Sequence, residues 1–281
     1  MKKTPDTYPN QAETEPLSTP LIGDKAPVFE AETTKGFIHF PQDYQGRWVI
    51  LFSHPSDFTP VCTTEFIMFA KMMNDFKALN TELIGLSVDS LSSHIGWLYA
   101  IEHDVNFNGL KNIHIDFPLI ADLSTQIARQ YGMLHPNTCS TKTVRSVFFI
   151  DPVGTIRTIL HYPMCTGRNF AELKRILLSL QLNDEYGVST PADWQPSDDI
   201  IIPNPSTVEE AIHAHNRNID TTSVWFLSLS PIPKDDAPKA SANYKNKKNK
   251  IGPKKQSKQN KKSAQFSLKK NTYADKTNKT I

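Results

Sequence analysis

A continuous apolar run, Trp48-Val49-Ile50-Leu51-Phe52, constrains the fold of this chain more than any other feature. Five apolar residues in succession leave no polar face, which is typical of a strand buried on both sides of a sheet. A helix start follows closely, because Thr59 is a good N-cap residue and Pro60 is favoured at the first helical position. The pattern therefore predicts a central strand that leads directly into a helix.

Strands and helices are predicted to alternate along the rest of this region. In the helix that begins at Pro60, apolar residues recur at three- and four-residue steps and predict one core-facing stripe, made of Phe66, Phe69, Met73 and Phe76. Apolar runs predict further strands at 83–88, 117–120, 147–150 and 155–162, and helices are expected through 97–103 and over 169–182. The second of these helices has an apolar side made of Phe170, Leu173, Ile176, Leu177 and Leu180. This alternation predicts an α/β domain with a mixed sheet.

The chain divides into four parts by composition. Residues 1–20 are polar and rich in proline and predict a flexible lead, 21–186 form the predicted domain, and 187–233 are short apolar patches separated by prolines. Such patches cannot bury a core alone, so we expect this arm to lie across another surface. Residues 234–281 carry 15 Lys against three Asp and almost no apolar side chains, and predict a disordered tail. The tail holds a charge of +12 and leaves −10 for the rest of the chain.

The cysteines and the N-terminus bear on the compartment. Three widely spaced cysteines argue against a secreted disulfide framework, and residues 1–9 lack the apolar run of a signal peptide. We therefore expect a reducing, cytoplasmic location.

Cys62 falls in the first turn of the helix predicted from Pro60. Backbone N–H groups there have no partner within the helix, and the positive end of the helix dipole lies close by. This position favours a thiolate, which is the nucleophilic form of cysteine. The alternative is that Cys62 serves as a small buried hydrophobic residue.

The segment from Ser53 to Glu65 contains the pattern Pro55-x-x-x-Thr59-x-x-Cys62. It resembles the active-site signature of the peroxiredoxins, and its longer run resembles the one-cysteine subgroup. Three later stretches agree in order, at 90–97, 143–151 and 166–170, and the resemblance covers roughly 21–231. It implies a thioredoxin-like fold with the peroxiredoxin insertions and a C-terminal arm that packs on a partner subunit, so a homodimer or a higher oligomer is expected.

The resemblance also implies an activity and a set of catalytic residues. The enzyme would be a thiol-dependent peroxidase that reduces hydrogen peroxide and organic hydroperoxides through a cysteine sulfenic acid. Cys62 would be the nucleophile, Thr59 and Arg145 would orient the peroxide and stabilise charge, and Pro55 would shield the sulfur. Thr59 could instead only cap the helix, Arg145 could be a surface residue, and Pro55 could simply form a turn.

Three further residues are expected to support this site. In the family, the positions of Glu65 and Arg168 join a network that steadies the active-site arginine, although a first-turn carboxylate also stabilises a helix by itself. His54 could polarise the site or assist reduction of the oxidised cysteine, or it could be a core histidine with satisfied hydrogen bonds. A metal site at His54 and Cys62 is not expected, because no second ligand pair has suitable spacing. No cofactor is predicted.

Regeneration of Cys62 requires a second thiol, since a sulfenic acid condenses with one to form a disulfide. Glu65 occupies the position where a thioredoxin-type Cys-x-x-Cys motif would have its second cysteine, so that class is excluded. Cys139 and Cys165 remain candidate resolving thiols. Neither lies in the C-terminal region where two-cysteine families carry theirs, so an external reductant is favoured: a thioredoxin-like protein, glutathione or another small thiol.

Two further hypotheses remain open. The same cysteine could serve a peroxide sensor or a redox-regulated chaperone. The lysines of 234–281 could bind nucleic acid or an anionic membrane by counterion release, although a solvated extension is the simpler interpretation. Deletion of this tail would then abolish such binding and leave peroxidase activity intact.

Overall fold

The strand β3 (Trp48–Ser53) lies inside a seven-stranded mixed sheet of order β2-β1-β5-β4-β3-β6-β7. The computed structural model describes residues 19–139, 141–217, 224 and 226–232. The other strands of this sheet are β1 (Phe29–Thr33), β2 (Gly36–Phe40), β4 (Thr81–Ser87), β5 (Leu119–Ala121), β6 (Arg145–Ile150) and β7 (Ile156–Tyr162). β3 pairs in parallel with β4 and antiparallel with β6, so both of its edges are hydrogen-bonded.

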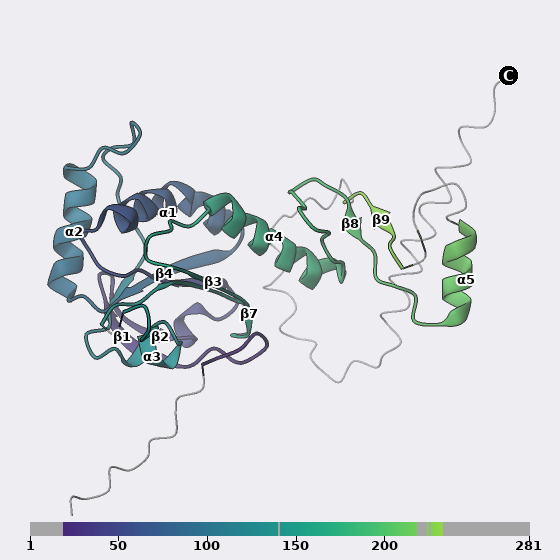
Figure 1. The fold of residues 1–281 in the computed structure, drawn as a ribbon, viewed down its shortest axis with the longest axis horizontal. Coiled ribbons are helices and arrows are strands. Elements are labelled where there is room, and N and C mark those ends of the chain that lie inside the picture. The colour runs from purple at the N-terminus through teal and green to yellow at the C-terminus, as the bar shows by residue number, and fades with distance from the viewer. Residues whose placement is uncertain (1–18, 140, 218–223, 225, 233–281) are drawn as a thin grey trace, which may run out of the picture. The chain divides into compact units, whose positions relative to one another are not determined.

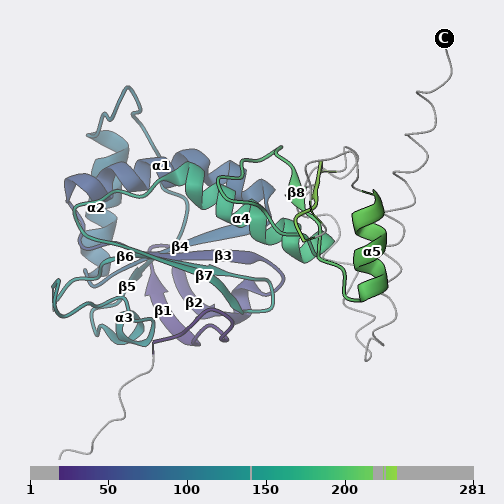
Figure 2. The ribbon, with the colours of Figure 1, turned by 45° about the vertical axis from the view of Figure 1, so that its right-hand side comes forward.

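Helices cover both faces of this sheet. They are α1 (Pro60–Ala78), α2 (Leu91–His103), α3 (Gln126–Gln130) and α4 (Phe170–Tyr186), with a short 3-10 helix η1 (Gln42–Tyr44). Figures 1 and 2 show α1 and α4 along one face of the sheet and α3 at the other. Alternate residues of β3 enter two separate cores: Ile50 and Phe52 lie in the core under α1 and α4, whereas Val49 and Leu51 lie in the core under α3. This explains why the sequence of β3 has no polar face.

Several predicted elements are confirmed. The strand predicted at 48–52 and the helix start at Pro60 are observed, and all four residues of the predicted stripe on α1 are buried. The helix predicted over 169–182 extends to Tyr186, and the strand predicted at 117–120 is shorter and begins at Leu119. The sequence analysis did not identify β1, β2 or α3, because these elements are only five residues long and carry weak periodicity.

The predicted cap of α1 needs a correction. Thr59 occupies the N-cap position with extended backbone angles, φ −110° and ψ 143°, but its side chain caps no helix N–H. Its hydroxyl instead donates to the carbonyl oxygen of Ser56 over 2.8 Å. The Pro60 ring already removes one of the unpaired N–H groups of the first turn, so less is lost when the cap is absent.

The arm packs partly on the domain from which it departs. Val188, Trp194 and Ile200 are buried in the core that also contains residues of α1 and α4. Further along, β8 (Ile200–Ile201) pairs with β9 (Leu229–Ser230), and a helix α5 (Val208–Arg217) that the sequence analysis did not predict lies between them. β9 begins only at Leu229, and Trp225 lies outside the described residues.

Much of the predicted lead and all of the lysine-rich tail lie outside the part of the chain that the structure describes. Thr19 and Pro20 are described at the end of the lead, and Pro20 is buried. Within the described ranges, no helix combines the length and apolar character needed to cross a membrane.

Candidate active site around Cys62

Cys62 lies at the third residue of α1, with its side chain fully buried. Its Sγ atom is 3.2 Å from Nη1 of Arg145, which donates to it. The sulfur therefore faces a fixed positive charge and also lies in the first turn of the helix, where the dipole is positive. Both effects favour a negatively charged sulfur at this position.

Arg145 is held rigidly by groups other than the sulfur. It is the first residue of β6, which pairs with β3, so the sheet carries it to the end of the strand that precedes α1. Nε and Nη2 both donate to the carbonyl oxygen of Met164, over 3.1 Å and 2.7 Å. Nη1 donates to Oε2 of Glu65 over 2.7 Å as well as to the sulfur. The guanidinium is thus fixed before any substrate arrives.

Glu65 is shared by two arginines. Nη2 of Arg168 donates to Oε2 over 2.6 Å, while the backbone N–H and Nε of Arg168 donate to Oε1 over 2.9 Å each. The Arg168 guanidinium also lies over the rings of Phe52 and Phe69, at 5.2 Å and 5.4 Å from their centroids. Burial alone would raise the pKa of the Glu65 carboxyl, but the two guanidiniums, Arg168 foremost, outweigh it and hold this pKa below its usual range.

A second buried network begins at His54, directly after β3. His54 Nε2 is 2.9 Å from Oδ1 of Asp57, and the other oxygen, Oδ2, is 2.8 Å from Nδ1 of His94 on α2. Burial lowers the pKa of His54 more than its bond to Asp57 raises it. Burial would raise the pKa of Asp57, but the hydrogen bonds from the two imidazoles outweigh it and hold that pKa well below its usual range.

The rim of the site is formed by the turn before α1. Pro55 is buried and Thr59 is half-buried, while Pro60 is exposed. The Thr59 hydroxyl donates to the Ser56 carbonyl, which leaves its lone pairs free to accept a hydrogen bond.

The structure does not join Cys139 or Cys165 to Cys62. All three cysteines are free; Cys139 is partly exposed and Cys165 is exposed. Hydrogen bonds with Thr141 lower the pKa of the Cys139 thiol. Cys165 follows Met164, the residue whose carbonyl holds Arg145.

Two other features of the described residues bring together groups of the kinds found in binding sites. Ligand atoms of His54, Asp57 and Asp89 lie within 4.8 Å of one another. However, both carboxylate oxygens of Asp57 face imidazole nitrogens, and Asp89 accepts from the backbone N–H of Asp57 and the hydroxyl of Ser87, so hydrogen bonding accounts for their proximity.

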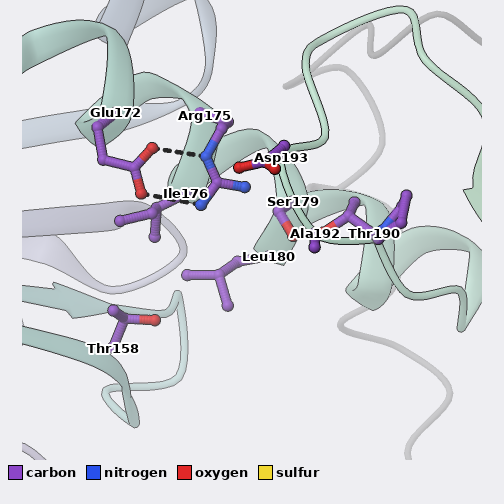
Figure 3. A pocket seen from close by; sticks show the side chains of 10 residues that line it. Thr158, Glu172, Arg175, Ile176, Ser179, Leu180, Thr190, Ala192 and Asp193 are labelled. Atoms are coloured by element: carbon purple, nitrogen blue, oxygen red, sulfur yellow. Dashed lines mark hydrogen bonds and ion pairs between the residues drawn. The ribbon is translucent and has the colours of Figure 1, made fainter.

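The second feature is an open hollow of about 460 Å³ between α4 and the beginning of the arm. Figure 3 shows it lined by the Glu172–Arg175 ion pair and by Asp193, with Thr158 opposite. None of the residues around Cys62 lines this hollow, so we assign it no part in the chemistry.

Residues 22–159 match the AhpC/TSA family, and residues 179–214 match the C-terminal domain of 1-Cys peroxiredoxin. A peroxiredoxin of Methanosarcina mazei is 58% identical over 212 residues, which cover 75% of this chain and 97% of the relative. The chain belongs to the peroxiredoxin family. A peroxiredoxin of Aquifex aeolicus is 48% identical over 228 residues, covering 78% of this chain and all of the relative.

Solved peroxiredoxin structures show the same fold. The yeast mitochondrial 1-Cys peroxiredoxin superposes with a TM-score of 0.66 at 40% identity, covering 76% of this chain and 100% of that one. A cysteine-to-serine mutant of Peroxiredoxin 6 of Arenicola marina gives 0.64 at 34% identity, covering 76% and 99%. The expected thioredoxin-like fold is therefore confirmed, and this peroxiredoxin is a thiol-dependent peroxidase.

Sequence analysis missed three groups of this peroxiredoxin site. Asp57 and His94 both lie inside the stretches that resemble the family, yet neither was singled out. Their signal was weak, because their contact joins residues 37 positions apart. The Met164 carbonyl could not be found at all, since every residue has one.

Proposed function

We propose that Cys62 is the residue that this peroxidase uses to attack peroxide. The observation that carries the proposal is the contact of 3.2 Å between the Cys62 sulfur and a guanidinium that Glu65 and the Met164 carbonyl hold in place. A cysteine buried only for packing needs no charged partner, whereas a thiolate nucleophile does.

The proposed reaction is a displacement at oxygen. The Cys62 thiolate attacks one oxygen of the peroxide, an S–O bond forms as the O–O bond breaks, and the cysteine is oxidised to a sulfenic acid. The second oxygen leaves as hydroxide or alkoxide and takes up a proton, giving water or an alcohol. Negative charge moves from sulfur to the leaving oxygen, and Arg145 lies where its N–H groups can stabilise that charge.

Thr59 and Pro55 are proposed to position the peroxide. The Thr59 hydroxyl donates to Ser56 and still has lone pairs, so it can accept a hydrogen bond from a peroxide O–H. Pro55 is buried beside the site and has no N–H that could compete for the sulfur or the peroxide. Glu65 and Arg168 are proposed to act indirectly: Arg168 holds Glu65, and Glu65 holds the Arg145 guanidinium in position.

We propose that an external thiol regenerates the enzyme. The thiol condenses with the sulfenic acid to a mixed disulfide and water, and a second thiol then releases reduced Cys62 and a new disulfide. The related yeast mitochondrial enzyme has been studied for thiol resolution through glutathione and thioredoxin systems. Cys139 and Cys165 remain candidates for internal resolution, and the three free cysteines suit a reducing, cytoplasmic compartment.

The arm, predicted at 187–233, is proposed to pack on a second copy of the chain and to form at least a homodimer. Exposed apolar side chains on and after α5 support this: Val208, Ile212, Leu227 and Leu229. Light scattering on the reduced protein tests the proposal, and a monomer at micromolar concentration would contradict it.

Stopped-flow oxidation of the reduced protein by hydrogen peroxide tests the central proposal. Wild type is compared with Cys62→Ser and with the double variant Cys139→Ser/Cys165→Ser. Oxidation should be lost in the first variant and keep its rate in the second, and a sulfenic acid trap should label Cys62 alone. Fast oxidation that survives Cys62→Ser would refute the proposal.

A further inference from the structure

Three side chains from separate parts of the chain form a buried series beside the Cys62 helix. His54 follows β3, Asp57 lies in the turn before α1, and His94 lies on α2. Side-chain exposures are 0% for both histidines and 1% for Asp57. Because all three side chains are buried, we infer the protons of this series from which atoms face one another.

His94 faces acceptors with both ring nitrogens. Nδ1 is 2.8 Å from Oδ2 of Asp57, and Nε2 is 3.1 Å from the carbonyl oxygen of Ile120. A carbonyl oxygen can only accept, so Nε2 must carry a proton. An ionised Asp57 can also only accept, so Nδ1 must carry one too, and His94 is then an imidazolium paired with a buried carboxylate.

His54 is left as a neutral ring. Its Nε2 is 2.9 Å from Oδ1 of Asp57 and must donate to it, whereas its Nδ1 is buried and has no hydrogen-bond partner among the described residues. A proton on Nδ1 would create a second buried cation with no acceptor, at a high cost in free energy. The lone pair of Nδ1 therefore accepts no hydrogen bond from the part of the chain that the structure describes.

The His54 ring lies against Phe66 of α1 and Trp97 of α2. It packs edge-on against Phe66, with centroids 4.9 Å apart, and stacks on Trp97 at 5.1 Å. Phe66 is one helical turn after Cys62, and the Trp97 indole N–H donates to the hydroxyl of Thr63, the residue after Cys62. The protonation state of His54 therefore acts at short range on the turn that carries the nucleophile.

We propose that His94 is a positioning residue of the peroxidase: a buried imidazolium that neutralises Asp57 and thereby keeps His54 neutral, with a proton on Nε2 and a bare Nδ1. The inference deepens the function proposed above and rests on it. Removal of the cation at His94 should move the positive charge to His54, because a buried Asp57 carboxylate needs one cationic partner.

Asp89 is the other charged group that acts on this series. Its Oδ2 accepts from the Asp57 backbone N–H and the Ser87 hydroxyl, and its Oδ1 accepts from the Ser56 hydroxyl. It makes no hydrogen bond to either imidazole, so its negative charge acts on His54 without fixing a proton on that ring.

Nitrogen-15 NMR of histidine-labelled, reduced full-length protein measures these protons directly. At pH 5 to 8, His94 should show two protonated ring nitrogens, and His54 should show a protonated Nε2 and an unprotonated Nδ1. Exposed His114, paired with Glu102, gives the reference signal, and His114→Asn serves as the control variant.

Two substitutions separate charge from geometry. In Asp57→Asn the amide oxygen can accept from His54 and the amide nitrogen can donate to His94, so all three hydrogen bonds remain while both charges disappear. His94 should then lose one proton, and His54 should keep its tautomer. In His94→Asn, His54 should gain a proton on Nδ1, and the pH profile of Cys62 oxidation should acquire a step between pH 5 and 8 that wild type and His114→Asn lack.

The outcomes separate this inference from the proposed function. An unprotonated ring nitrogen on His94 in the wild type at pH 7, or a proton on Nδ1 of His54, overturns the assignment whatever the activity. A wild-type pH profile in folded His94→Asn overturns the positioning role. If Cys62→Ser still reacts quickly with peroxide, the proposed function fails while the NMR result stands. If His94→Asn does not fold, the NMR spectra of wild type and Asp57→Asn still test the proton assignment.

Discussion

At the scale of single residues, the site is a set of buried charges that neutralise one another. Glu65 joins Arg145 and Arg168, and all three side chains are at most 3% exposed. The shared carboxylate fixes Arg145, and Arg145 in turn contacts the sulfur. The chemistry proposed for Cys62 would therefore depend on Glu65 and Arg168 through their hold on Arg145.

Arg145 should be sensitive even to conservative change. Arg145→Gln should lower the second-order rate of Cys62 oxidation by about 10²–10³-fold, because it removes a donor aimed at the developing charge. Arg145→Lys keeps the charge but cannot donate to the sulfur, Glu65 and the Met164 carbonyl at once. Its rate should therefore fall between those of wild type and Arg145→Gln. Stopped-flow kinetics with hydrogen peroxide measures this, and equal rates for Arg145→Lys and wild type would contradict it.

Glu65→Gln should destabilise the fold by about 3–5 kcal/mol, since it leaves two buried guanidiniums without their carboxylate. Urea unfolding at pH 7 measures this cost. Glu102→Gln, at a half-buried carboxylate that pairs with the exposed His114, is the control and should leave the unfolding free energy nearly unchanged.

The pH dependence of the unfolding free energy of Glu65→Gln gives a second test. The pKa of Glu65 is lowered from 4.5 in the folded chain, so its stabilising contribution is present above pH 4.5 and is lost as pH falls through the folded-state pKa. Wild type should therefore lose stability in acid more steeply than Glu65→Gln. Parallel curves would show that Glu65 is not ionised in the fold.

At the scale of elements, the site is assembled by β3, α1 and β6. β3 ends next to the turn that opens α1, and the antiparallel pairing of β3 with β6 brings Arg145 to the same end. Phe52 of β3 and Phe69 of α1 stack with centroids 3.9 Å apart, directly under the Arg168 guanidinium. The aromatic core thus packs against the Arg168 guanidinium and restricts its position.

Phe69→Ala should cost about 3–5 kcal/mol of unfolding free energy, because it opens a cavity in a fully buried cluster. It should also lower the rate of Cys62 oxidation, since Arg168 loses one of its two aromatic supports. Chemical denaturation and stopped-flow kinetics on one preparation test both effects. Val153→Ala, at a side chain that is 67% exposed, is the matched control and should change neither.

At the scale of the whole molecule, the arm is tied to the domain through a few buried side chains. Trp194 is 1% exposed and its indole N–H donates to the carbonyl oxygen of Asp198 over 3.2 Å. The hydrogen bond to the Cys62 sulfur comes from Arg145, which lies before the arm. Fold stability and chemistry are therefore expected to respond differently to changes in the arm.

Trp194→Ala should destabilise the protein by about 3–5 kcal/mol and expose the arm to proteases, while folded protein keeps its rate of Cys62 oxidation. Limited proteolysis, urea unfolding and stopped-flow kinetics give the three readouts. Ile22→Ala, at a side chain that is 66% exposed, should leave all three unchanged. Loss of oxidation in folded Trp194→Ala would show that the arm takes part in the site.

The sequence by itself determined the central strand, the helix that carries Cys62 and the family, because an apolar run, an N-terminal helix signal and an ordered set of motifs are local features. Only the tertiary structure decided how the charges meet. It brought Arg145 into contact with Cys62, 83 positions earlier in the sequence, and His94 into contact with Asp57, 37 positions earlier. It also showed that the Thr59 side chain caps no helix N–H. Such contacts depend on strand pairing and helix packing, which bring distant residues together and leave no mark in local sequence.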